Sequence, residues 1–300
     1  MRKAFVSALL EEARVDSSII LITGDLGYGI LDIFQKELPN QFINAGVAEQ
    51  SMMSMAAGIA STGKKVFVYS IANFPTLRCL EQIRNDICLM NLPVVVVAVG
   101  AGYSYGSQGY THHALEDIAV MRALPNMEII VPADSEDTKI ITKLIIDRKS
   151  PSYLRLGRDN EPIIHRELPN IQFGKINELY SGKNGTLLFC GPIGGIALQA
   201  RTHLANSGIE VAVASVPFVS DLDLNYLKAA SKIGPIVSIE EHSHRGGLGS
   251  SILETLSINS ISADVRILAS MQKNISQIGS QEFLRAENGL TVDRIVKIFN

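Results

Sequence analysis

The sequence predicts an α/β protein with two domains, each a parallel β-sheet covered by helices. The chain has 300 residues, a length that favours about two domains. Short apolar runs rich in β-branched residues alternate with segments of helical periodicity, a pattern typical of parallel sheets whose strands are joined by helices. A polar stretch at 157–185 interrupts this alternation. We therefore predict a first domain over residues 1–165 and a second, smaller one over residues 180–300.

In the first domain, strand-like runs and helical segments follow one another in turn. The run LPVVVVAV at 92–99 contains no polar side chain, so we expect it to be a strand buried on both faces. The expected strands cover 19–23, 42–44, 65–69, 92–99, 127–131 and 152–156, and the expected helices cover 4–14, 47–62, 74–90, 115–123 and 135–146.

The second domain follows a polar segment that contains Pro162 and Pro169, which we interpret as a linker and an initial hairpin. Alternation then resumes. The expected strands cover 186–190, 209–216, 235–240 and 265–269, and the expected helices cover 195–206, 222–231 and 248–256, with further helical segments up to residue 300.

Composition excludes several classes of protein. Hydrophobic residues make up 46% of the chain, enough for a packed core, and the 27 basic and 30 acidic residues give a net charge of −3, which argues against a nucleic-acid partner. The first residues reach Glu11 and Glu12 before any long apolar run, so we predict neither a signal peptide nor a membrane span, and a cytoplasmic protein. Three cysteines without a CxxC pattern are predicted to be small core residues, and we expect no metal site in this chain.

Ligands of open α/β sheets bind beyond the carboxyl ends of the strands, where this sequence has four polar loops. The longest, GAGYSYGSQGYTHHALED, follows the strand at 92–99 and carries His112 and His113, which are suited either to close over a substrate or to cap the next helix. Glu49 begins an otherwise apolar helix, so its carboxylate is either a buried functional group or part of a capping box with Gly46 as the N-cap. No serine-hydrolase, P-loop, zincin or EF-hand motif is found in the sequence.

Four segments in this order resemble the transketolase family: FINAGVAEQSMMSMAAGIASTGKKVFVYSIANFPTLRCLEQIRND, GSQGYTHHALEDIAVMRALPNMEIIVPAD, PSYLRLGR and VSIEEHSHRGGLGS. The resemblance covers nearly the whole chain but only the family's pyrimidine-binding and carboxyl-terminal domains. The diphosphate-binding domain, with its magnesium-binding GDG motif, has no counterpart, since the GDL at 24–26 lacks the third glycine. The resemblance therefore implies thiamine diphosphate as cofactor and a partner subunit that holds its diphosphate and Mg²⁺.

The resemblance also assigns the cofactor-binding residues. The pyrimidine ring of thiamine diphosphate needs a carboxyl group on its ring nitrogen to favour the imino tautomer, whose exocyclic nitrogen then removes the thiazolium proton. Glu49 in GVAEQ matches that catalytic position, and burial suits it because desolvation favours a protonated carboxyl group. Phe74 lies where the family stacks an aromatic ring on the pyrimidine, although SIANFP departs from the usual spacing.

Substrate contacts are implied in the same way. His112 in GYTHHALED matches the histidine of the family's GPTHQ-like motif, suited to contact reacting hydroxyls, and His113 is its neighbour. Arg158 in PSYLRLGR matches the position that pairs with a sugar phosphate, where a guanidinium fits. A transketolase proper has histidine where Gly100 falls and aspartate where Gln108 falls, so we expect the sugar preference to differ.

The leading hypothesis is one subunit of a split enzyme, assembled as α₂β₂ by analogy, that transfers a two-carbon ketol unit between sugars, which we expect to be phosphorylated. One alternative is the β subunit of a 2-oxo acid dehydrogenase, which shares the architecture and the glutamate. The THH sequence and the surroundings of Arg158 favour sugars. A catalytically silent interaction subunit is a third possibility, against which the retention of Glu49 argues.

Overall fold

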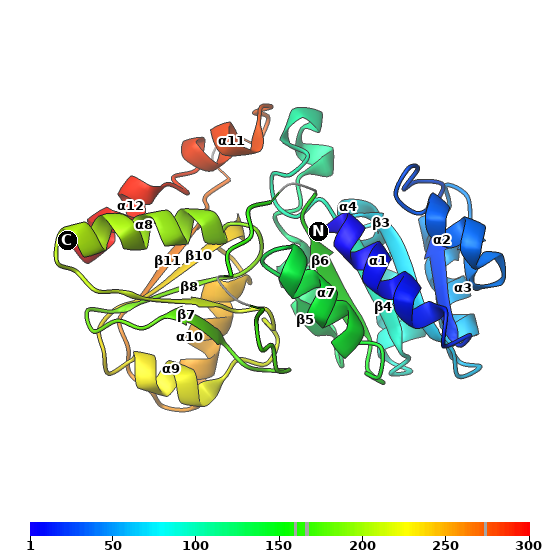
Figure 1. The fold of residues 1–300 in the computed structure, drawn as a ribbon, viewed down its shortest axis with the longest axis horizontal. Coiled ribbons are helices and arrows are strands. Elements are labelled where there is room, and N and C mark those ends of the chain that lie inside the picture. The colour runs from blue at the N-terminus through cyan, green and yellow to red at the C-terminus, as the bar shows by residue number, and fades with distance from the viewer. Residues whose placement is uncertain (159–160, 166–167, 273–274) are drawn as a thin grey trace.

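The computed structural model describes residues 1–158, 161–165, 168–272 and 275–300, which form two α/β domains lying side by side (Figure 1). The first is built on a six-stranded, fully parallel sheet with the order β2-β1-β3-β4-β6-β5. Its strands are β1 (Ile19–Thr23), β2 (Phe42–Asn44), β3 (Lys65–Ile71), β4 (Val94–Val99), β5 (Glu128–Ile130) and β6 (Ser152–Leu156). The predicted strands are thus confirmed, with boundaries that differ by at most two residues.

Helices cover both faces of this sheet. Alternate residues of β4 point to opposite sides: Val94 and Val96 join the cluster under α3, and Val95 and Val97 join the cluster under α1 and α7, which pack together. The helices are α1 (Arg2–Ala13), α2 (Asp32–Glu37), η1 (Pro39–Gln41), α3 (Glu49–Ala60), α4 (Asn73–Thr76), α5 (Leu80–Gln82), η2 (Ile83–Cys88), η3 (Gly106–Gln108), η4 (Tyr110–His112), α6 (Asp117–Arg122) and α7 (Ser135–Leu144). Burial on both faces of β4 is confirmed.

The expected single helix over 74–90 is wrong. The segment breaks at Cys79, whose φ of −110° and ψ of 16° leave the helical region, and it ends in a π-helical stretch, η2. Pro75 lies in the short first piece, α4. Helical periodicity is preserved across the break, which is why the sequence pattern did not reveal it. Such irregular turns are frequent at functional sites.

The second domain has a five-stranded mixed sheet of order β11-β10-β8-β9-β7, in which only β7 runs antiparallel. The hairpin expected within 157–185 is wrong, because the described residues of that segment form one strand, β7, and it pairs with β9. Both edges of β8 are taken by β9 and β10, so the free edge of β9 receives β7. The elements are β7 (Asn177–Tyr180), β8 (Thr186–Phe189), β9 (Ala212–Ser215), β10 (Ile236–Ser243), β11 (Val265–Ser270), α8 (Gly194–Asn206), α9 (Leu224–Ala230), α10 (Leu248–Ile258), α11 (Gln281–Glu287) and α12 (Val292–Phe299).

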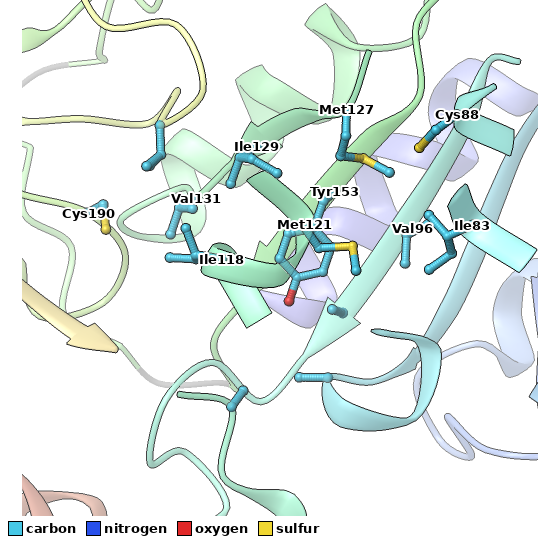
Figure 2. Packing of buried hydrophobic residues seen from close by; sticks show 14 of the residues in the cluster. Ile83, Cys88, Val96, Ile118, Met121, Met127, Ile129, Val131, Tyr153 and Cys190 are labelled. Carbon is cyan, nitrogen blue, oxygen red and sulfur yellow. The ribbon is translucent and has the colours of Figure 1, made fainter. Parts of the chain in front are cut away.

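One apolar cluster runs from the first domain into the second (Figure 2). Ile129 of β5 and Val131, just after it, also exchange backbone hydrogen bonds with the segment after β9, at 2.9 Å to Val219 and 2.8 Å to Pro217. All three cysteines are buried, which confirms their prediction as core residues. Among the described residues, no helix is long and apolar enough to cross a membrane.

Candidate active site

Glu49 is the first residue of α3, at the carboxyl edge of the first sheet. Ala48, not Gly46, is the N-cap, and no side chain caps this helix, so the capping-box alternative is wrong. The Glu49 side chain is only 4% exposed, and its Oε2 accepts a hydrogen bond from Nη1 of Arg78 at 2.7 Å. The hydrogen-bond partner of this buried carboxylate among the described residues is thus a cation that is half exposed.

Phe74 lies on α4, and Arg78 follows it by four residues. The Arg78 guanidinium carbon is 4.8 Å from the centroid of the half-buried Phe74 ring, so one planar cation contacts both Phe74 and Glu49. Sequence analysis missed Arg78. The spacing in FPTLR was a usable signal, because residues four apart share one face of a helix.

His112 ends η4 and joins this group. Its ring meets that of Phe74 edge-on with centroids 5.4 Å apart, and its Nδ1 lies 3.0 Å from the Thr111 hydroxyl. Desolvation, aided by the neighbouring His113, lowers the pKa of His112, which favours the neutral ring at pH 7. A neutral imidazole can both accept and donate hydrogen bonds to hydroxyl groups.

His113 belongs to the same loop, but its side chain is buried. Its side chain is 2% exposed, with Nε2 3.3 Å from the Gly106 carbonyl oxygen and its ring edge-on to Tyr103 at 5.3 Å. Its own carbonyl accepts a hydrogen bond of 2.6 Å from the Asn73 side chain. These contacts give His113 a part in shaping the loop, and they place only His112 of the pair beside Phe74.

Arg158 lies after β6 and contacts Tyr105. Its guanidinium donates to the Ser104 carbonyl at 3.2 Å and lies 5.0 Å from the centroid of the Tyr105 ring, which in turn is 6.3 Å from that of His112. Arg158 also lines a cavity of about 760 Å³ between the domains, together with Arg2 and Arg285. The structure therefore links Arg158 to His112 through Tyr105, and among the described residues it shows no contact of Arg158 with Glu49 or Phe74.

Glu241 of β10, in the second domain, binds the loop after β4 that carries His112 and His113. This 2% exposed carboxylate accepts hydrogen bonds from the Tyr103 backbone N–H at 2.5 Å, from Nε of Arg285 at 2.5 Å and from the Gln281 amide at 2.9 Å. Gly102, with φ +60°, makes room, since a Cβ there would lie 2.5 Å from Cγ of Glu241. Glu241 thus ties the second domain to the loop, a role that sequence analysis missed.

A second buried network supports the same loop. Arg155 and Asp117, both essentially unexposed, pair at 2.6 Å, and the Tyr153 hydroxyl donates to the same carboxylate at 2.5 Å. Arg155 also donates to the carbonyl oxygens of Ala114, at 2.7 Å, and Glu241, at 3.1 Å. The far end of the loop is thereby fixed to β6 and to the second domain.

Among the described residues, Asp134, Asp137 and His165 are close enough together to hold a metal ion. Their polar atoms already have partners: Asp134 caps α7 through the backbone N–H groups of Glu136 and Asp137, and Nε2 of His165 lies 2.5 Å from Asp137. Desolvation lowers the pKa of His165, but the hydrogen bond to Asp137 and the charges of both aspartates outweigh it and raise the pKa. These contacts hold the segment around His165 against α7.

Two family models match the chain. They are the transketolase pyrimidine binding domain, over residues 1–162, and the transketolase C-terminal domain, over residues 174–295. The chain belongs to the transketolase family. The resemblance predicted from the sequence motifs is confirmed, and the two sheets are those of a pyrimidine-binding domain and a transketolase C-terminal domain.

Similar proteins include separate subunits of transketolases. The chain is 39% identical over 300 residues to one subunit of the apulose-4-phosphate transketolase of Phocaeicola vulgatus, covering 99% of this chain and 95% of that protein. It is 31% identical over 299 residues to a 6-deoxy-6-sulfo-D-fructose transketolase subunit of a Clostridium species, covering 99% and 92%. A solved structure described as a split gene transketolase, inactive beta4 tetramer, matches with a TM-score of 0.91 and 33% identity over 99% of this chain and 96% of that one.

These matches favour the transketolase hypothesis over a 2-oxo acid dehydrogenase subunit. The chain is a subunit of a split, transketolase-like transferase that depends on thiamine diphosphate, and it works with a partner subunit. The roles of Glu49, Phe74, His112, His113 and Arg158, and the boundaries of the two domains, stay predictions.

Proposed function

We propose that this chain is the β subunit of an α₂β₂ enzyme that transfers a two-carbon ketol unit between phosphorylated sugars. The single observation that carries the proposal is the meeting of Glu49, Phe74 and His112, from three separate segments, at the carboxyl edge of one parallel sheet. Similar subunits named for apulose 4-phosphate and for 6-deoxy-6-sulfo-D-fructose support a sugar with an anionic end as substrate.

The residues present fit the pyrimidine ring of the cofactor. Arg78 already brings a planar group with N–H donors against Phe74 and within 2.7 Å of the Glu49 carboxylate. This double contact supports a site in which Glu49 hydrogen-bonds to the edge of a flat, nitrogen-bearing ring and Phe74 contacts its face. When bound, thiamine diphosphate supplies a nucleophilic carbon that accepts the ketol unit.

The chain's own groups then act on ring and substrate. Glu49 binds the pyrimidine ring nitrogen and holds a proton there. His112, whose pKa is lowered by desolvation, orients the sugar hydroxyls beside Phe74. We assign this contact to His112 rather than to the buried His113. Arg158 pairs with the phosphate group at the far end of the sugar.

A partner subunit holds the diphosphate and Mg²⁺ in this proposal. In this chain Asp25, of the GDL segment, accepts hydrogen bonds from Tyr28 at 2.6 Å and from Asn44 at 3.0 Å, contacts that serve the local turn. The similar proteins named as transketolase subunits support a partner of this kind. A cytoplasmic location remains part of the proposal.

The substitution Glu49→Gln tests the proposal in the complex with the diphosphate-binding subunit. The glutamine keeps the size of the side chain but cannot transfer a proton, so we expect exchange of the cofactor's C2 proton to slow by at least ~10²-fold. Ketol transfer from a ketose phosphate to an aldose phosphate should fall with it. The matched control is Glu81→Gln on the exposed surface of α5. C2 exchange by the Glu49→Gln complex near the wild-type rate would contradict the assignment.

A further inference from the structure

Tyr105 occupies space that a side chain at position 100 would otherwise take. Gly100 has φ +97°, and a Cβ built on it would lie 2.2 and 2.3 Å from two carbons of the Tyr105 ring. The ring therefore packs directly on the backbone just past β4, and only glycine at position 100 permits this. The departure from the transketolase pattern at Gly100 is thus linked to the position of Tyr105.

Tyr105 contacts two residues to which the proposed function gives substrate roles. Its half-buried ring contacts both the His112 ring, at 6.3 Å between centroids, and the guanidinium of Arg158, which lies 5.0 Å from the centroid of the Tyr105 ring. Its neighbours Ser104 and Gly106 line the cavity between the domains. Within the part of the chain that the structure describes, the ring takes part in these contacts but its hydroxyl makes no hydrogen bond. A phenol in this position has both its donor and its acceptor capacity to offer.

We propose that Tyr105 is a specificity-determining residue for the sugar. The inference rests on the proposed function, in which His112 contacts the reacting end of the substrate and Arg158 its phosphate. Tyr105 contacts both of these residues, and its hydroxyl has no hydrogen-bond partner among the described residues. In this proposal the hydroxyl therefore binds a hydroxyl group of the sugar chain between the reacting carbon and the phosphate. Its ring, fixed by Gly100 and Arg158, limits the room available there.

The test compares Tyr105→Phe with the wild type in the complex with the diphosphate-binding subunit. Tyr110→Phe is the matched control, since Tyr110 lies in the same loop but is 47% exposed and outside the group of contacts around Arg158. The probes are a four-carbon aldose phosphate and its analogue without the hydroxyl next to the phosphate-bearing carbon. Calorimetric affinity and kcat/KM are measured for both, and thermal unfolding verifies that each variant is folded.

We expect Tyr105→Phe to weaken binding of the hydroxylated sugar by roughly tenfold, the worth of one hydrogen bond, and to leave the deoxy analogue unchanged. Tyr110→Phe should change neither affinity. Gly100→Ala, which must displace the ring, should reproduce the loss. Equal effects of Tyr105→Phe on the two sugars, or no effect on either, would overturn the inference while sugar binding by the wild type upholds the proposed function. A wild-type complex that binds neither sugar phosphate contradicts both.

Discussion

The two domains place acidic side chains at or near the carboxyl ends of their sheets, and these side chains have different surroundings. In the first domain, Glu49 accepts one hydrogen bond among the described residues, from an arginine that is 48% exposed. In the second, Glu240 accepts the N–H groups of Leu248 and Gly249 at 2.7 and 2.9 Å, and Glu241 binds backbone, amide and guanidinium groups at once. All three carboxylates are buried, so burial alone does not distinguish a carboxylate of the candidate active site from one that stabilises the fold. The number and the exposure of their hydrogen-bond partners distinguish them.

The largest effect that tests this comparison concerns stability. Glu241→Ala leaves the N–H of Tyr103 and the mostly buried Arg285 without their acceptor, so we expect a loss of about 3–5 kcal/mol in the free energy of unfolding. Glu49→Ala leaves Arg78 free to turn into solvent and should cost about 1 kcal/mol or less. Urea denaturation of the two variants measures both. Equal losses would show that the two carboxylates play the same structural part.

Local signals account for what the sequence predicted well. The run at 92–99 has an apolar composition that predicts a strand covered on both faces, as the structure shows. The motif GVAEQ singled out Glu49 through its resemblance to the transketolase family; the structure shows that this side chain is buried, and its catalytic role stays a prediction. The break at Cys79 was missed because the helical period continues across it. The pairing of β7 with β9 was missed because it depends on which sheet edge remains free.

The contacts that shape the candidate site were harder to predict because they join distant segments. Glu241 reaches Tyr103 across 138 positions in the sequence, and Gly102 owes its identity to that side chain. Gly100 and Tyr105 are close in sequence, but only the folded loop shows that one makes room for the other. Composition and hydrophobic periodicity do not predict which residues of such pairs come into contact.

Arg158→Ala should affect binding with little effect on stability, because the guanidinium is exposed and its partners are a carbonyl oxygen and a ring face. Loss of a charge-assisted pair worth about 1.5–3 kcal/mol should raise KM roughly 10- to 150-fold for phosphorylated sugars and hardly at all for free sugars. Steady-state kinetics on the assembled complex, with Arg14→Ala as a surface control, separates the two cases. An equal rise in KM for both kinds of sugar would rule out the phosphate assignment.

The smallest effect concerns His165, whose contribution to the free energy of unfolding depends on pH. Desolvation opposes its charge, but Asp137 and Asp134 raise its pKa in the folded state above the unfolded value of about 6.5. A raised pKa means that the charged pair stabilises the fold fully below pH ~6.5 and that this contribution is lost as the pH rises through the folded-state pKa. We therefore expect His165→Gln to lower the free energy of unfolding by about 1 kcal/mol at pH 6 and by less at pH 9. The matched control, His203→Gln on the exposed face of α8, should show no such difference. A difference in the free energy of unfolding between wild type and His165→Gln that widened as the pH rose would contradict this expectation. It would mean that the neutral ring stabilises the fold, as a packed hydrogen-bond donor rather than as a charged partner of Asp137.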